Sequence, residues 1–121
     1  MIIFHVEDDE DIREIAKMAL EMTGDFEVVQ QDCGEGALSI AADIRPDVLL
    51  LDVMMPGATG PETLIKLRKF SHLADVPVIY MTARIQPKEI DALMQTGALG
   101  VVVKPFDPMT LGQTILDLIK T

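Results

Sequence analysis

The sequence predicts an α/β fold in which five parallel strands alternate with five helices. Short apolar runs rich in β-branched residues recur along the chain, and stretches with helical spacing of apolar residues separate them. The run Val48–Leu51 has no polar break, which is typical of a strand buried on both faces of a parallel sheet. Such alternation implies right-handed crossovers and helices on both faces of the sheet.

The five predicted strands are short, and turn or helix-capping residues separate them from the helices. They are Ile2–Val6, Phe26–Gln31, Val48–Asp52, Val76–Met81 and Leu99–Val103. The second has the weakest pattern, so we expect it near an edge of the sheet. Because the strands are parallel, their carboxyl ends meet at one end of the sheet, where open α/β sheets bind ligands.

Each helix is predicted from apolar residues at the spacing of a buried stripe. The expected stripes are Ile12, Ile15, Ala16 and Ala19; Ala37, Ile40, Ala41 and Ile44; Leu64, Leu67 and Phe70; Ile90, Leu93 and Met94; and Leu111, Ile115, Leu118 and Ile119. Asp9 is a suitable cap for the first helix. Asp107 followed by Pro108 is expected to begin the last helix, because proline favours the first helical position.

Length and composition are those of one folded domain. The chain has 121 residues, 49% of them hydrophobic, so disorder is a poor interpretation. We expect one domain over residues 1–121, with no effector domain. No apolar run approaches the ~18 residues of a membrane span, so no membrane insertion is expected. The single cysteine, Cys33, allows no internal disulfide and fits a reducing cytoplasm.

The charge balance restricts the possible partners. Ten Lys and Arg residues stand against 20 Asp and Glu residues, which gives a net charge of -10. A surface of this sign is repelled by nucleic-acid phosphates and by anionic membranes. We therefore expect no direct binding of nucleic acid, and favour a protein partner or a bound cation.

Polar side chains follow four of the predicted strands. Glu7 and Asp8 follow the first strand, and Asp52 ends the third. Thr82 and Lys104 follow the fourth and fifth. Clustered carboxylates repel one another unless a cation neutralises them, and their hard oxygen atoms suit Mg²⁺. Since a carboxylate can also act as a nucleophile towards phosphorus, this pattern predicts phosphoryl transfer to Asp52 with Mg²⁺.

Four blocks of sequence resemble those of bacterial two-component response-regulator receiver domains, in particular the single-domain type found among chemotaxis regulators. They are Val6-Glu7-Asp8-Asp9, Asp52 with Met55-Pro56-Gly57, Thr82-Ala83 and Lys104-Pro105-Phe106. They occur in the family's order and spacing, and the match covers essentially the whole chain. The resemblance implies a flavodoxin-like (βα)5 fold, doubly wound, with strand order 2-1-3-4-5.

The resemblance also implies a function. It makes Asp52 the phosphoacceptor, supplied by the phosphohistidine of a sensor histidine kinase or a histidine phosphotransfer protein. It places Mg²⁺ on Asp8, Asp52 and the backbone carbonyl of Met54, with Glu7 acting through water. Such a domain is a signalling module rather than an enzyme, because it supports only its own phosphotransfer and autodephosphorylation.

The resemblance assigns the switch residues as well, with one departure. Thr82 corresponds to the switch hydroxyl and Lys104 to the phosphate-contacting lysine, and the family implies a cis peptide bond between Lys104 and Pro105. Receivers often carry an aromatic switch residue three positions before this lysine. Here that position is Val101, so this chain lacks the residue that the aromatic version of the switch uses.

Further expectations concern phosphoryl lifetime and binding surfaces. Two positions beside the site tune the lifetime in the family, and here they are Met54 and Arg84. By resemblance, the phosphodonor docks on the first helix and on the loop after the fifth strand. The surface formed by the fourth helix, fifth strand and fifth helix binds a downstream protein or serves in a relay.

Three alternatives remain beside this interpretation. Val101 lends weight to a receiver-like interaction domain that works without phosphorylation. A Mg²⁺-dependent phosphohydrolase with an aspartyl-phosphate intermediate usually carries a second acid two residues after the nucleophile, where this chain has Met54. A flavin-binding module of the same fold needs a Ser-, Thr- and Gly-rich phosphate loop after the first strand, whereas Glu7–Asp11 is acidic throughout.

Overall fold

The computed structural model of the protein describes residues 1–120. The strands in this range are β1 (Ile2–Val6), β2 (Glu27–Gln31), β3 (Val48–Asp52), β4 (Val78–Thr82) and β5 (Gly100–Val103). The α-helices are α1 (Glu10–Glu21), α2 (Gly34–Ile40), α3 (Gly60–Leu67), α4 (Pro87–Met94) and α5 (Leu111–Lys120). Two short 3-10 helices, η1 (Ala41–Asp43) and η2 (Ser71–Leu73), follow α2 and α3.

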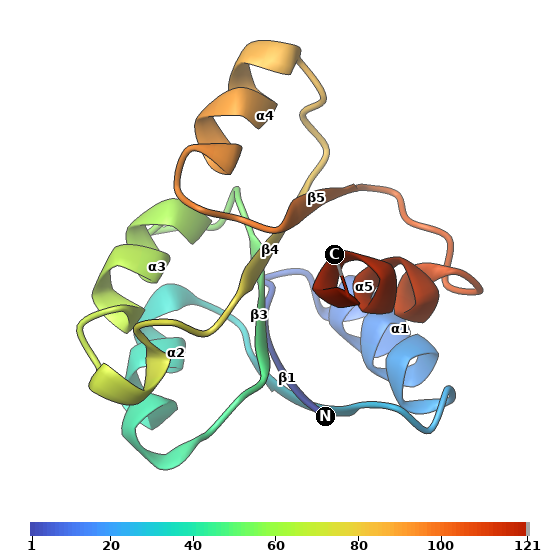
Figure 1. The fold of residues 1–121 in the computed structure, drawn as a ribbon, viewed down its shortest axis with the longest axis horizontal. Coiled ribbons are helices and arrows are strands. Elements are labelled where there is room, and N and C mark those ends of the chain that lie inside the picture. The colour runs from blue at the N-terminus through green and yellow to red at the C-terminus, as the bar shows by residue number, and fades with distance from the viewer. Residues whose placement is uncertain (121) are drawn as a thin grey trace.

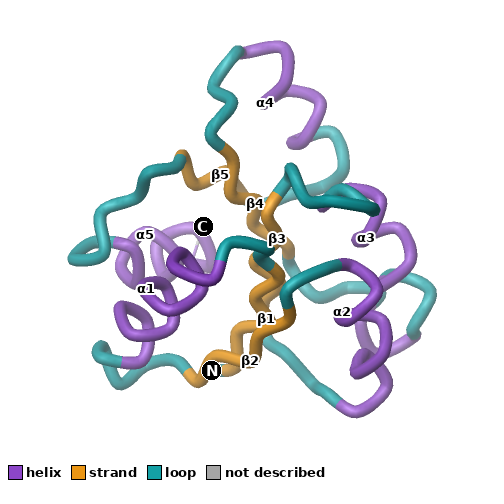
Figure 2. The backbone as a smooth tube through the Cα atoms, turned by 180° about the vertical axis from the view of Figure 1, so that it is seen from behind, coloured by secondary structure: helices purple, strands orange, loops and turns teal. Residues whose placement is uncertain are grey.

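The strands form one parallel sheet in the order β2-β1-β3-β4-β5, as predicted. Helices α1 and α5 cover one face, and α2 and α3 cover the other (Figure 1). Helix α4 lies beside the β5 edge, and the view from behind shows the same layers (Figure 2). This is the doubly wound, flavodoxin-like arrangement. Within residues 1–120, no helix is both long and apolar enough to cross a membrane.

Strand β3 lies at the centre of the sheet and is buried along its whole length. Leu49 and Leu51 belong to the core under α2, α3 and α4, while Val48 and Leu50 belong to the core under α1 and α5. The uninterrupted apolar run therefore supplies both cores from one strand, and its position places Asp52 at the carboxyl end of the sheet.

Three strands differ from the prediction at their ends. Strand β2 begins at Glu27 rather than Phe26, and β4 ends at Thr82 rather than Met81. Strand β4 begins at Val78 rather than Val76. The preceding Pro77 has no N–H to donate to a neighbouring strand, although its carbonyl accepts a hydrogen bond from Leu49 N at 2.8 Å. Strand β5 begins at Gly100, one residue later than expected. Strand β2 lies at the edge of the sheet, as predicted.

The predicted stripe of α1 is wrong in one position. Ile15 is 44% exposed, whereas Ala16 and Leu20 are fully buried. The covered side of the helix is thus rotated towards Leu20, which the predicted stripe omitted. Ile15 instead lines a surface groove that Met109 also borders, on the far side of the loop leading to α5.

The predicted stripes of α2 and α3 continue beyond the helices themselves. Helix α2 ends at Ile40, and the buried Ala41 already belongs to η1. Helix α3 ends at Leu67, so Phe70 packs against the core from the loop that follows. In both places, apolar residues continue to be covered after the helical hydrogen bonds end.

Two corrections concern the last two helices. Met94 is 40% exposed and does not face inwards as predicted, while Leu93 is 7% exposed and does. Helix α5 begins at Leu111 rather than at Pro108. Asp107 still organises this turn, because its Oδ1 accepts a hydrogen bond from Met109 N at 2.9 Å and its carbonyl accepts one from Leu111 N at 3.0 Å.

Candidate functional site

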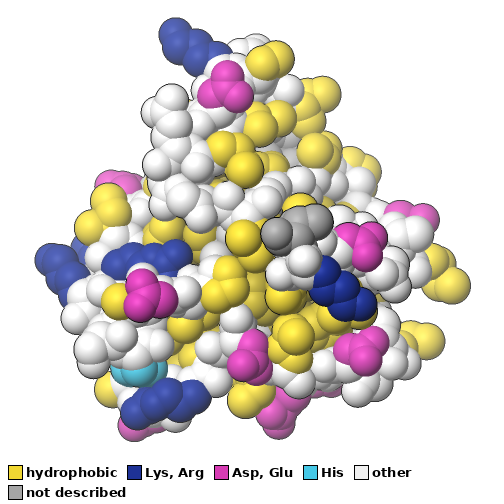
Figure 3. Space-filling model, viewed as in Figure 1, with side chains coloured by type: hydrophobic (Ala, Val, Ile, Leu, Met, Phe, Trp, Pro, Cys, Tyr) yellow, Lys and Arg dark blue, Asp and Glu magenta, His cyan; other side chains and the backbone are white. Residues whose placement is uncertain are grey.

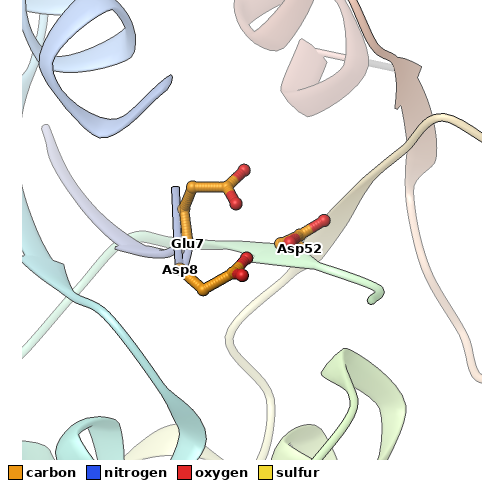
Figure 4. Close-up of side chains that lie close together, drawn as sticks. All are labelled: Glu7, Asp8 and Asp52. Carbon is orange, nitrogen blue, oxygen red and sulfur yellow. The ribbon is translucent and has the colours of Figure 1, made fainter. Parts of the chain in front are cut away.

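The strand order brings the predicted acidic residues together. Strands β1 and β3 are neighbours, with Val6 opposite Leu51, so Glu7 and Asp8 leave β1 beside Asp52. The side chains of Glu7 and Asp8 extend towards Asp52 (Figure 4). One oxygen from each of the three carboxylates lies within 4.8 Å of the others. The structure therefore confirms that these three residues lie close together at the carboxyl end of the sheet.

The acidic loop is held by local hydrogen bonds. Asp9 caps α1, since its Oδ1 accepts a hydrogen bond from Ile12 N at 3.1 Å. The side chain of Glu7 turns back onto this loop, and its Oε2 accepts from Asp9 N at 3.2 Å. Arg13 donates from Nη1 to the carbonyls of Glu7 and Asp8, at 2.8 and 3.1 Å. Sequence reasoning missed Arg13, because only the fold directs its side chain towards the loop.

Lys104 joins two of the buried carboxylates. Its Nζ donates a hydrogen bond to Asp52 Oδ1 at 2.8 Å and lies 2.6 Å from Glu7 Oε1. Glu7 is fully buried and Asp52 is 3% exposed. The contact with Glu7 is an ion pair rather than a well-directed hydrogen bond, since Oε1 accepts none of good geometry within the described chain. One ammonium group therefore serves two carboxylates that have little or no contact with water.

Burial determines the protonation of these groups. It raises the pKa of Glu7 to about 7, an effect that neighbouring Asp52 increases and Lys104 opposes. Burial also raises the pKa of Asp52, again against the influence of Lys104. Burial by itself lowers the pKa of Lys104, but its close contacts with the carboxylates of Asp52 and Glu7 outweigh burial, and the pKa is raised overall. The site thus carries more negative charge than its single cation neutralises.

These residues fit a divalent cation with a preference for oxygen. Glu7, Asp8 and Asp52 offer three hard oxygen ligands within 4.8 Å of one another. Mg²⁺ commonly binds one or two carboxylates, keeps several waters and adds phosphate oxygens. Asp8 is exposed and so accessible to a hydrated ion, while the buried Glu7 Oε1 lacks a well-directed hydrogen bond. A cation here would offset the excess negative charge.

Thr82 lies on the other side of Asp52, at the end of β4. Its side chain is buried, and Oγ1 accepts a hydrogen bond from Arg84 N at 3.0 Å. That bond uses an oxygen lone pair, so the hydroxyl hydrogen remains free to be donated. Thr82 also borders a cavity of about 220 Å³. It is lined by Val53, Met54, Thr82, Arg84, Glu89, Ala92 and Leu93.

The remaining predicted residues flank the same region. The peptide bond between Lys104 and Pro105 is cis, as the resemblance implied. Val101 is half-buried and lies opposite Tyr80 in the pairing of β5 with β4. Tyr80 is fully buried, and its hydroxyl lies 3.2 Å from Thr96 Oγ1, just beyond α4. An aromatic side chain is thus present near this position, but on β4, where the prediction did not look.

The family is decided by a match that spans this whole arrangement. The model of the response regulator receiver domain family matches residues 3–116, which include all the site residues described above and every strand except the first residue of β1. This chain belongs to that family. It is a receiver domain of the signalling type that serves two-component systems, and not a classical enzyme.

Curated relatives include longer proteins. The receiver domain is 34% identical over 109 residues to the phosphate regulon transcriptional regulatory protein PhoB of Pseudomonas aeruginosa, with 90% of this chain and 47% of PhoB aligned. It is 37% identical over 105 residues to the regulatory protein AtoC of Escherichia coli, with 87% of this chain and 22% of AtoC aligned. The chain thus spans about half the length of these relatives, or less.

Solved structures match over nearly their full length. The chemotaxis response regulator CheY4 of Vibrio cholerae superposes with a TM-score of 0.88 at 32% identity, covering 97% of both chains. The receiver domain of the Francisella response regulator 1452 gives a TM-score of 0.85 at 26% identity, covering 98% of this chain and 96% of that chain. Both likenesses agree with the strand order and the helical layers.

Proposed function

We propose that Asp52 accepts a phosphoryl group from a phosphohistidine, and that the phosphorylated domain changes its binding to a downstream protein. One observation carries this proposal: a nearly buried aspartate at the carboxyl end of the central strand, with an ammonium group 2.8 Å away and two further carboxylates close by. A buried charge in an open sheet at this place calls for a role in the chemistry.

The reaction exchanges one bond to phosphorus for another. A carboxylate oxygen of Asp52 forms the new bond to phosphorus, while the bond between phosphorus and the donor's imidazole nitrogen breaks. The imidazole keeps the electron pair of that bond and takes up a proton, so the donor returns to neutral histidine. Such transfers depend mainly on positioning and on neutralising the charge of the phosphoryl oxygens.

The chain's own residues supply much of that neutralisation. The ammonium group of Lys104 already lies beside Asp52, so it can donate to a phosphoryl oxygen. The hydroxyl of Thr82 has a hydrogen to donate on the opposite side. Asp8, Asp52 and the carbonyl of Met54 would hold Mg²⁺, with Glu7 acting through water. When bound, the ion would neutralise phosphoryl oxygens.

Two neighbouring residues are proposed to tune the lifetime of the aspartyl phosphate. Met54 is 51% exposed and borders the cavity beside Thr82, as does Arg84. Met54 would control the approach of hydrolytic water, and Arg84 would add positive charge. We expect the autodephosphorylation rates of Met54→Asn and Arg84→Ala to differ from that of the parent. Two unchanged rates would contradict these roles.

The partners follow from the same proposal. A sensor histidine kinase or histidine phosphotransfer protein would dock on α1 and the loop after β5, and the α4–β5–α5 surface would bind a downstream protein, in the cytoplasm. Direct binding of nucleic acid is not expected from the net charge of -10. Figure 3 supports this for the face it shows, where Lys and Arg side chains lie apart rather than in one basic patch.

The decisive experiment measures intact mass after incubation with acetyl phosphate and Mg²⁺. We expect one phosphoryl adduct on the parent that is stable in acid and labile in base, and none on Asp52→Asn. Chelation of Mg²⁺ with EDTA should prevent the adduct on the parent. If neither acetyl phosphate, a phosphohistidine donor nor beryllofluoride modifies or binds the parent, the domain is a phosphorylation-independent interaction domain instead. Sustained turnover of a phosphate ester would indicate a phosphohydrolase.

A further inference from the structure

Arg84 is attached to two parts of the site at once. Its backbone N–H donates to the Thr82 hydroxyl oxygen at 3.0 Å. Its side chain extends to the first turn of α4, where Nη1 lies 3.6 Å from Glu89 Oε1. The side chains of Arg84 and Glu89 are 59% and 37% exposed. Arg84 therefore connects the predicted switch hydroxyl to α4 through its own backbone and side chain.

The cavity beside Thr82 allows the guanidinium group a second position. Its walls include both members of this ion pair and also Val53 and Met54, which follow Asp52 directly in the chain. The volume of about 220 Å³ is several times that of a water molecule. Because Arg84 borders this cavity, its long side chain has space to turn away from Glu89 towards Val53 and Met54.

Few contacts hold helix α4 in place. Within the described chain, Leu93 is its one buried residue. A hydrogen bond between Tyr80 and Thr96 holds the far end of the helix, and the ion pair with Arg84 holds the first turn. Loss of the ion pair would free the first turn of α4 while Leu93 and Thr96 keep the other end in place.

A phosphoryl group on Asp52 would compete with Glu89 for Arg84. A phosphoryl group carries about -1.5 to -2 charges at neutral pH, and a guanidinium group binds its oxygens in a bidentate manner. The carboxylate of Glu89 carries a single charge and holds Arg84 at 3.6 Å in a half-exposed setting, where ion pairs are weak. The stronger anion should therefore draw Arg84 away.

We propose that Glu89 is a positioning residue which holds Arg84 on α4 until a phosphoryl group on Asp52 takes it over. This inference rests on the proposed function and adds its regulation. Phosphorylation would break the ion pair and loosen the first turn of α4. In return, Glu89 would lower the affinity of the site for a phosphoryl group by the free energy needed to release Arg84, because the two effects are linked.

The test measures the affinity of the whole chain for beryllofluoride, a phosphoryl mimic, in the presence of Mg²⁺ by isothermal titration calorimetry. Glu89→Gln should bind roughly two- to fivefold more tightly than the parent, the range expected for an exposed ion pair. Arg84→Gln should bind more weakly. In the Arg84→Gln background, Glu89→Gln should have no further effect, and this non-additivity is something a purely structural role would not produce.

Two controls separate the ion pair from general charge effects. Asp91→Asn removes one negative charge from the exposed surface of the same helix, without any described contact to Arg84, and should match the parent. Glu89→Asp keeps the charge and should lie close to the parent. The gain from Glu89→Gln should also shrink at high salt, because exposed ion pairs are screened.

The possible results decide between the two proposals. An unchanged affinity in Glu89→Gln would overturn the role of Glu89, and so would an equal gain in the Arg84→Gln background or in Asp91→Asn. In each of these cases the parent still binds beryllofluoride, and the proposed function stands. If the parent itself fails to bind with Mg²⁺ present, the proposed function fails, and this inference fails with it.

Discussion

The two sides of Asp52 are built in different ways. Towards α1 and β5, Glu7 and Lys104 form a buried ion pair at 2.6 Å, within a loop held by several hydrogen bonds. Towards α4, Arg84 and Glu89 form a half-exposed pair at 3.6 Å beside a cavity. The first side fixes charges beside the proposed phosphoacceptor. The second leaves space and weak contacts, which suit the proposed response of α4 to phosphorylation.

The energetic consequence of this difference is large. Breaking a buried ion pair leaves a charge without water or a partner, which is strongly destabilising. Breaking an exposed pair has little effect on stability, because water replaces the partner. Substitutions on the α1 side should therefore change the stability of the whole domain, whereas those on the α4 side should mainly change local opening and ligand affinity.

The largest effect is expected for Lys104→Met. This change leaves Glu7 and Asp52 buried without their cation, and should lower the free energy of unfolding by about 3–5 kcal/mol at pH 8 in EDTA. The loss should be smaller at pH 5, where the carboxylates take up protons. Urea unfolding measures both. Lys88→Met on the exposed surface of α4 is the control and should stay within about 0.5 kcal/mol of the parent. Equal losses of stability in Lys104→Met and Lys88→Met would contradict the proposed difference between the buried and the exposed side of Asp52.

In the absence of metal, Glu7→Gln should raise the free energy of unfolding, whereas Lys104→Met should lower it. The folded pKa of Glu7, about 7, lies above its unfolded value of 4.5, so the folded state binds more protons between these values. The corresponding stability is present below pH 4.5 and is lost as the pH rises through 7. Glu7→Gln should avoid this loss and gain up to about 3 kcal/mol at pH 8 in EDTA.

The difference in the free energy of unfolding between Glu7→Gln and the parent isolates the contribution of the raised pKa of Glu7. His5, whose pKa burial and the nearby charges of Lys104 and Arg13 lower from 6.5 to about 3, acts in the other direction and is common to both proteins. Its contribution is present above pH 6.5 and is lost as the pH falls towards 3. Thermal unfolding at several pH values gives the difference. A pH-independent difference would contradict the raised pKa of Glu7. Added Mg²⁺ should stabilise the parent more than the variant.

Leu93→Ala should cost about 2 kcal/mol, at the lower end for a leucine in a core. Leu93 is 7% exposed and already borders a cavity, so fewer contacts are lost. Leu111→Ala on α5 is the matched change at a residue that is 1% exposed, and it should cost more. Hydrogen exchange should show faster opening of α4 than of α5 in the Leu93 variant. Equal costs for the two changes would mean that α4 is held as firmly as α5.

The smallest effect on stability is expected for Tyr80→Phe. The ring volume is kept, and the lost hydrogen bond to Thr96 should cost about 1 kcal/mol. Thr96 keeps a partner, since its hydroxyl also donates to Leu93 O at 2.6 Å. Amide exchange should rise at the end of α4 and stay unchanged in α5. An even rise along the chain would show that Tyr80 supports the core in general rather than this helix.

The fold was predictable because its signals are local and periodic. The unbroken run of β3 indicated a central strand, and the parallel topology then placed Glu7, Asp8 and Asp52 at one end of the sheet. The cis bond before Pro105 agrees with the family resemblance. The metal ligands and the role of Thr82 stay predictions that the phosphorylation experiments test.

The errors arise where burial depends on distant packing. Ile15 and Met94 fit the apolar spacing of their helices, but 44% and 40% of their surface is exposed. A periodic stripe indicates that a helix has a covered side, and the neighbouring elements decide which residues of that stripe they reach. Leu93 is the one buried residue of α4 within the described chain, and the apolar spacing of the helix does not distinguish it from Ile90 or Met94.

By itself, the sequence determined the type and order of the elements and the meeting of the acidic residues at the ends of parallel strands, because hydrogen bonding and side-chain periodicity are set within each segment. The tertiary structure decided the electrostatics. Lys104 reaches Asp52 across 52 positions of chain, and burial of Glu7 raises its pKa to about 7. The ion pair between Arg84 and Glu89 likewise depends on where α4 lies. Charges interact through space and respond to water, so their energies follow only from the folded arrangement.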